Sequence, residues 1–188
     1  AAMVTRYLQS IPEPIKLVQD LGANNGHYSR LAAGHARLVV SQDIDPIAVS
    51  ANYRIAQEAA LRNILPLELD LIAPPPAIGW GNRERDSFSQ RQPADVVMAL
   101  ALIHHLAISN NLPLERLAQF FASRGEWLII EFVPKSDSQV EVLLATRTDI
   151  FPGYNEENFE HVFSQVFKIQ EKQSIEGSER SLYLLKKL

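Results

Sequence analysis

The sequence predicts an α/β fold, a three-layer sandwich in which helices cover both faces of a mostly parallel, seven-stranded sheet that ends in an antiparallel hairpin. Short apolar, strand-like runs alternate with helix-like runs from residue 15 to about residue 150, which is the pattern of a parallel sheet buried on both faces. After residue 165 the alternation stops, and two strand-like runs follow each other with a glycine between them. These two observations give the two parts of the predicted sheet.

Five strand-like runs make up the parallel part. They span residues 15–20, 36–42, 65–71, 95–100 and 127–132. Helix-like runs lie between them at residues 26–33, 46–61 and 113–123. Pro46 favours a helix start because proline fits the first helical turn, and the apolar spacing from Leu114 to Phe121 is that of a helix.

The closing hairpin is predicted at residues 166–172 and 181–186, around Gly177. Residues 73–94 are the least regular part of the chain, since three prolines are followed by Gly79-Trp80-Gly81. This segment predicts a loop with a short helix. A long loop beside the carboxyl end of a sheet often carries function.

The composition is that of one globular domain, residues 1–188. Of the 188 residues, 46% are hydrophobic and 21% are charged. No apolar run approaches the roughly 20 residues that span a bilayer. The chain has no cysteine, which excludes disulfides and thiolate metal sites and favours the cytoplasm. Because it opens with Ala-Ala-Met, it is compatible with the carboxyl-terminal part of a longer protein.

The charge argues against a nucleic-acid partner. The net charge is −4 and no basic stripe is visible. A small-molecule substrate is the class that fits such a surface best, and the oligomeric state is left open by the sequence. No cluster of acidic residues and histidines predicts a metal site.

A glycine loop follows the first predicted strand and opens a helix, in the segment Asp20-Leu-Gly22-Ala-Asn24-Asn-Gly26. Ligands of such sheets bind at the carboxyl ends of the strands, where glycines allow the backbone to approach closely. A dinucleotide site would have a glycine at position 24, where this chain has Asn24. The Asp20 carboxylate would also repel a pyrophosphate. Asp20 suits a cationic amino-acid group instead. The alternative is a strand–helix turn that binds nothing.

Two further acidic residues stand at the ends of the next predicted strands. Asp43 ends the second strand, about 20 positions beyond the loop, where an acidic residue bonds ribose hydroxyls. Asp45 is the alternative, but it can instead cap the helix that begins at Pro46. Asp70 ends the third strand and is placed to accept from an adenine amino group, with Leu71 against the ring. Its alternative role is to initiate the turn before the proline-rich loop.

These motifs resemble the class I S-adenosylmethionine-dependent methyltransferase superfamily, whose domain is Rossmann-like. Asp20-x-Gly22-x-x-x-Gly26 is similar to its first motif, and residues 95–106 and 127–132 resemble its fourth and fifth motifs. The resemblance implies S-adenosyl-L-methionine as cofactor. It implies cofactor contacts from Asp20, Gly22, Ala23, Asn24, Asn25, Gly26, Asp43, Ile44, Asp70, Leu71, Ala99 and Leu100.

A narrower resemblance covers two segments. Residues 99–111 and 129–139 resemble bacterial methyltransferase-like proteins related to the nodulation protein NoeA, in which this region is the carboxyl-terminal part of a longer chain. After the fourth strand, Ala99-Leu100-Ala101 stands where many amine and base methylases have Asn/Asp-Pro-Pro-Tyr/Phe. This departure argues against DNA, glutamine and base-nitrogen substrates.

Three residues are candidates for catalysis. His104 and His105 follow the fourth strand, where a histidine can take a proton near neutral pH; the alternative is that each packs under a helix. Glu131 ends the fifth strand, and its alternative is an ion pair with a residue such as Arg147. We expect the acceptor pocket to be walled by His104, His105, residues 131–133 and the loop that carries Trp80.

The expected function is transfer of the methyl group to an unidentified small-molecule acceptor. One alternative is a regulatory or vestigial domain that binds the cofactor without turnover. A nicotinamide-dependent oxidoreductase is disfavoured by Asn24 and Asp20.

Overall fold

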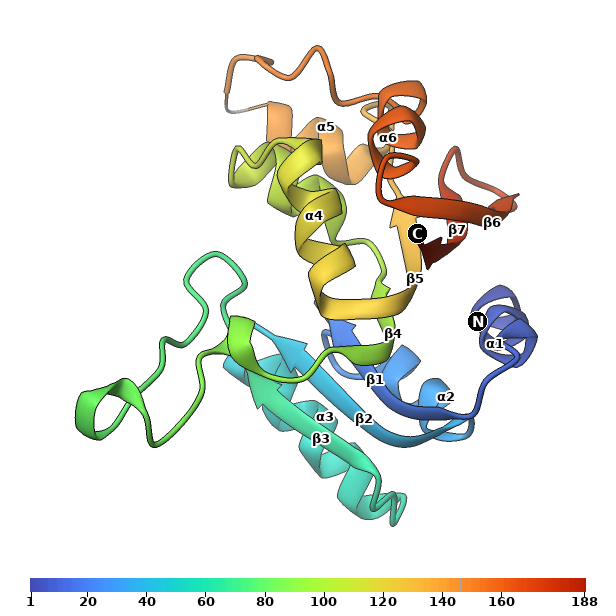
Figure 1. The fold of residues 1–188 in the computed structure, drawn as a ribbon. Coiled ribbons are helices and arrows are strands. Elements are labelled where there is room, and N and C mark those ends of the chain that lie inside the picture. Colours follow the sequence, from blue (N-terminus) through green and yellow to red (C-terminus); the bar gives the residue numbers. More distant parts are fainter. Residues whose placement is uncertain (146) are drawn as a thin grey trace. The chain divides into compact units, whose positions relative to one another are not determined.

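A computed structural model describes residues 1–145 and 147–188 (Figure 1). Their strands form a seven-stranded sheet with the order β3-β2-β1-β4-β5-β7-β6. The sheet is mostly parallel and ends in the antiparallel strands β5, β7 and β6, which confirms the predicted fold class. The chain forms two compact units, Ala1–Asp95 and Val96–Leu188.

The first unit contains three parallel strands and three helices. The strands are β1 (Ile15–Leu21), β2 (Ala36–Asp43) and β3 (Ile64–Glu68), and the helices are α1 (Ala2–Ser10), α2 (His27–Ala33) and α3 (Pro46–Glu58). The register pairs Leu21 with Gln42, so the strands carry the glycine loop and Asp43 to the same edge. Asp45 caps α3 by accepting from the Ile47 N–H at 2.8 Å, as its alternative role predicted.

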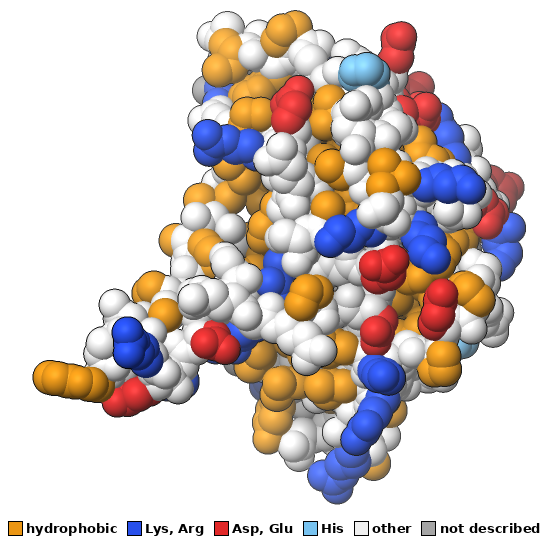
Figure 2. All heavy atoms as spheres, in the orientation of Figure 1, with side chains coloured by type: hydrophobic (Ala, Val, Ile, Leu, Met, Phe, Trp, Pro, Cys, Tyr) orange, Lys and Arg blue, Asp and Glu red, His pale blue; other side chains and the backbone are white. Residues whose placement is uncertain are grey.

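The segment after β3 is longer and less regular than a simple turn. β3 ends at Glu68, so the prediction of a strand to residue 71 was wrong. Residues 73–93 contain two short 3₁₀ helices, Trp80–Asn82 and Phe88–Gln90, and an isolated bridge between Ile78 and Arg85. In Figure 1 the segment projects away from β2 and β3, and Figure 2 shows it as a narrow arm.

The second unit contains most of β4 (Ala94–Ala99), then β5 (Gly125–Phe132), β6 (Phe167–Ser174) and β7 (Ser181–Lys187). Its helices are a π-helix (His105–Ser109), α4 (Leu114–Arg124), α5 (Ser138–Leu144) and α6 (Glu156–Phe163). Fully buried aromatic rings fill its core, with centroids 4.2 to 6.4 Å apart for the pairs Phe159–Phe163, Phe132–Phe159 and Phe121–Phe163. Within the described part of the chain, no helix is long and apolar enough to cross a membrane.

Candidate functional site

The loop between β1 and α2 turns sharply and is attached to the end of β2. Gly22 and Gly26 have φ angles of 72° and 76°, and Asn24 has a φ angle of 49°; such angles favour glycine and are tolerated by asparagine. The N–H groups of Gly22 and Ala23 donate to the Gln42 carbonyl oxygen at 2.8 and 3.0 Å. The predicted glycine loop is therefore a defined turn.

Gly26 also leaves no room for a side chain. A Cβ atom built on it would lie 2.0 Å from the Asn52 Oδ1 atom of α3. Asn52 is itself held in place, because its amide nitrogen donates to the Ser41 hydroxyl at 2.7 Å. The spacing of the glycines in the loop thus reflects the packing of α2 against α3 as well as access for a ligand.

We expect Gly26→Ala to destabilise the protein more than Gly177→Ala does. Both glycines have a φ angle of 76°, so both variants bear the same strain of about 1 kcal/mol, but only Gly26 meets a neighbour. The overlap with Asn52 should add about 1–3 kcal/mol. Urea unfolding of both variants measures the difference. Equal losses, or an excess that persists when Asn52→Ala is added, would contradict the proposed contact.

Asp20 is a buried carboxylate with no positively charged partner among the described residues. It lies in β1 with 2% of its surface exposed, and its Oδ2 atom accepts from the Ser29 hydroxyl of α2 at 2.5 Å. Its Oδ1 atom accepts no hydrogen bond within the described residues. Burial raises the Asp20 pKa from its ordinary 3.8 to about 7, the Ser29 hydrogen bond opposes this rise, and the Asp43 charge adds to it. Such a group gains most from an added cation.

Asp43 joins the glycine loop to the end of β2. Its Oδ2 atom accepts from the Asn24 N–H at 2.7 Å, and its Oδ1 atom accepts from the Asp45 N–H at 2.9 Å. Each carboxylate oxygen keeps a further lone pair that can accept from a ligand hydroxyl. Replacing Asp43 would therefore disturb the loop as well as any bound ribose, because the same carboxylate holds both.

The remaining predicted contacts in the first unit lie on its surface. Asp70 stands two positions beyond the end of β3, and its Oδ1 atom accepts from the Ile72 N–H at 2.8 Å, which confirms its role in initiating a turn. Its Oδ2 atom accepts nothing from the described residues. Ile44 is 62% exposed and Leu71 is half-buried, so both offer apolar surface. Asn25 is exposed, and its carbonyl oxygen accepts from Arg30 at 2.6 Å.

In the second unit, Glu131 is the centre of a polar network that begins after β4. Ala99 and Leu100 are buried, and Ala101 has a φ angle of 49°. The Ala101 N–H donates to the Glu131 Oε2 atom, and Arg180 donates to the Oε1 atom, both at 3.0 Å. Glu131 is therefore occupied on both oxygens, and it holds the strained residue that follows β4.

Arg180 is a functional candidate that the sequence reasoning missed. It donates to both oxygens of Asp137, at 2.7 and 2.9 Å, in addition to Glu131. The partner suggested for Glu131 was Arg147, but this was wrong, since Arg147 donates to the Ile108 carbonyl oxygen and to the Asn111 side chain. The antiparallel register pairs Phe132 with Ser181, and this pairing brings Arg180 to the end of β5.

His104 is buried, whereas His105 is exposed. His104 is 1% exposed and its Nδ1 atom has no hydrogen-bond partner among the described residues. Burial, together with the nearby His105 and Arg180, lowers its pKa from 6.5 to about 4, and Asp137 opposes this fall. His104 is therefore neutral at pH 7. Burial agrees with the packing alternative for this histidine, but its unpaired nitrogen remains available to a ligand.

A histidine titration by NMR tests this environment. We expect the ring resonances of His104 to stay constant between pH 6 and pH 8 and to move only near pH 4, because desolvation disfavours the charged ring. His104→Gln identifies the signals. A midpoint between pH 6 and pH 7 would contradict the buried, unpaired arrangement.

No family model matches the chain. It is 43% identical over 169 residues to the nodulation protein NoeA of Rhizobium meliloti (strain 1021), a match that covers 89% of this chain and 35% of NoeA. The chain thus spans about a third of the length of this relative.

Two solved structures show the same fold. The N-methyltransferase NodS from Bradyrhizobium japonicum WM9 superposes with a TM-score of 0.71 at 11% identity, covering 99% of this chain and 93% of NodS. The magnesium protoporphyrin IX methyltransferase ChlM from Synechocystis PCC 6803, with bound SAH, gives a TM-score of 0.66 at 21% identity, covering 100% of this chain and 81% of ChlM. The chain has the fold of class I methyltransferases.

Proposed function

Because the chain has the fold of the S-adenosylmethionine-dependent methyltransferases, we propose that it binds S-adenosyl-L-methionine and transfers its methyl group to a small-molecule acceptor. The buried Asp20 carboxylate, next to a glycine loop and without a cation, is the observation that carries this proposal. The ammonium of the cofactor's amino-acid part would supply the missing charge. NAD has no such group near its pyrophosphate.

The other groups of the first unit fit the rest of this ligand. Asp43 keeps lone pairs for ribose hydroxyls, and the free Oδ2 atom of Asp70 suits an amino group of a base. Ile44 and Leu71 offer apolar surface for a planar ring. These assignments account for the amino-acid, sugar and base parts of the cofactor, with one group for each part at or just beyond the ends of β1, β2 and β3.

The chemistry needs little from the protein beyond alignment. S-adenosylmethionine supplies a methyl group on a sulfonium: the acceptor's lone pair forms the new bond to carbon, and the electrons of the broken C–S bond stay on sulfur as a neutral thioether. Alignment of two reactants can correspond to an effective concentration of about 10⁵ M or more. An acceptor that arrives protonated must first lose a proton to a base or to water.

Three side chains of the second unit, Glu131, His104 and His105, have separate roles in this reaction. Glu131 acts by positioning, because both its oxygens are taken by Ala101 and Arg180. His104, neutral and with an unpaired nitrogen, orients the acceptor through a hydrogen bond and is a weak base at pH 7. His105, which is exposed, is the candidate for carrying a proton to solvent.

Formation of S-adenosylhomocysteine from S-adenosylmethionine tests the function. The protein is incubated with labelled S-adenosylmethionine and a panel of small amines, alcohols and carboxylates, and the product is quantified against reactions without acceptor. We expect acceptor-dependent product from the wild type and at least tenfold less from Asp20→Asn. If S-adenosylmethionine binds with no acceptor-dependent product from any panel member, the chain is better described as a binding domain without turnover.

A further inference from the structure

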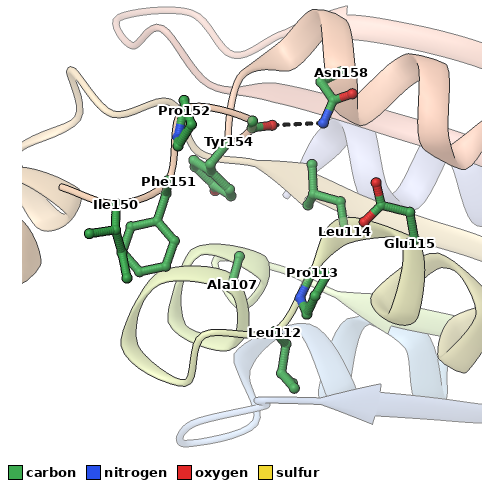
Figure 3. Close-up of a pocket in the computed structure, with 11 residues that line it drawn as sticks. Ala107, Leu112, Pro113, Leu114, Glu115, Ile150, Phe151, Pro152, Tyr154 and Asn158 are labelled. Carbon is green, nitrogen blue, oxygen red and sulfur yellow. Dashed lines mark hydrogen bonds between the residues drawn. The ribbon is translucent and has the colours of Figure 1, made fainter.

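A pocket of about 200 Å³ lies within the second unit, apart from the polar network around Glu131 (Figure 3). Its walls come from three segments. These are the π-helix at Ala107, residues 112–115 at the start of α4, and the loop of residues 150–154 together with Asn158 of α6.

The walls are mainly apolar. The apolar lining residues are Ala107, Leu112, Pro113, Leu114, Ile150, Phe151, Pro152 and Tyr154. An apolar cavity of about 150 Å³ is large enough to hold benzene. The pocket therefore has room for one six-membered ring or a short alkyl chain. Ile150 is 63% exposed, so part of this apolar surface faces solvent in the free protein.

The polar groups of the pocket are mostly acceptors. Glu115 carries the only formal charge among the lining residues, and its carboxylate has no partner within the described residues. The Asn158 amide donates to the Gly153 carbonyl oxygen at 2.8 Å, which leaves the Asn158 carbonyl oxygen free to accept. The N–H groups at the start of α4 offset part of the Glu115 charge, so the preference for a cation is expected to be moderate.

The pocket is held in shape by contacts that reach the end of β5. The Tyr154 hydroxyl donates to the Val133 carbonyl oxygen at 2.8 Å, and its ring stacks on Phe132 at 5.2 Å. Lys135 donates to the Phe151 carbonyl oxygen and is paired with Asp149, both at 2.7 Å. These contacts attach the loop of residues 150–154 to the end of β5.

We propose that this pocket binds the ring or short alkyl group of a small primary amine, with the ammonium directed to Glu115 and the Asn158 carbonyl oxygen. This binding site lies within the second unit alone.

Binding is tested with three probes of one ring each, namely benzylamine, benzyl alcohol and benzoate. We expect benzylamine to give saturable shifts in the methyl resonances of Leu114 and Ile150, with an affinity at least about threefold above that of benzoate. Glu115→Gln should abolish this preference, whereas Glu141→Gln, an exposed carboxylate in the first turn of α5, should not. Ala107→Leu should weaken binding of all three probes by filling the pocket.

Wild-type shifts that do not saturate, or equal affinities for benzylamine and benzoate, would overturn the proposed ligand class. Calorimetry with S-adenosylhomocysteine separates this pocket from the proposed function. If S-adenosylhomocysteine binds and benzylamine does not, only the amine-binding pocket is refuted. If benzylamine binds and S-adenosylhomocysteine does not, only the proposed function is refuted.

Discussion

Replacing Asp20 by asparagine is expected to stabilise the ligand-free protein at pH 8 and to weaken S-adenosylhomocysteine binding at least tenfold. The folded pKa of about 7 lies above the ordinary value of 3.8, so burial of the charged form costs free energy at pH 8. Asparagine fills the same space, keeps an oxygen for the Ser29 hydroxyl and removes the charge. One pKa unit corresponds to about 1.4 kcal/mol, which we take as the least gain expected.

The gain in stability from Asp20→Asn depends on pH. In the wild type, the contribution of Asp20 to stability is fully present below pH 3.8 and is lost as the pH rises to about 7. The gain from Asp20→Asn should therefore be small at pH 4 and largest at pH 8. Asp45→Asn is the matched control, because asparagine caps a helix as well as aspartate does. A destabilised Asp20→Asn protein that binds S-adenosylhomocysteine normally would contradict the assignment of Asp20.

Replacing Arg180 by glutamine should cause a large loss of stability, about 2–3 kcal/mol. The side chains of Glu131 and Asp137 are only 11% and 12% exposed, and both lose their cation in this variant. Arg180 lowers the pKa of Asp137, so its contribution is present above pH 3.8 and is lost as the pH falls through the lower folded pKa. The deficit should therefore narrow in acid.

Lys172→Gln provides the comparison. Lys172 also pairs with two carboxylates, Glu156 and Glu160, but these side chains are 37% and 35% exposed. Its loss should cost less than about 1 kcal/mol. Urea unfolding of both variants at pH 7 and pH 3.5 measures the contrast. Similar losses for the two variants would show that the Arg180 network contributes no more than a surface ion pair.

The parts of the fold that depend on local pattern were predictable from the sequence. The apolar runs placed the strands, and Pro46 marked the start of α3. Helix α1 was missed although Val4, Tyr7, Leu8 and Ile11 have helical spacing, because its N-cap residue, Ala1, supplies no side-chain cap. The predicted β3 extended too far, to residue 71. Leu69 lies beyond the end of the strand but is buried, so the apolar pattern of the sequence continues past Glu68.

The candidate site was predictable only in its residue types. Asp20, Gly22 and Gly26 follow a strand at a recognisable spacing, and their turn is local. The partner of Glu131 was not predictable, because the pairing with Arg180 depends on the register of β5 against β7, strands that lie far apart in the sequence. The protonation of His104 likewise depends on burial, which no local pattern encodes.

A calorimetric titration of the wild-type protein with S-adenosylhomocysteine, alongside NAD, tests the central claim most directly. The account predicts saturable binding of one S-adenosylhomocysteine per chain and no detectable heat from NAD, since only the former carries an ammonium for Asp20. Absence of S-adenosylhomocysteine binding to a folded protein, or binding of NAD in its place, would contradict it.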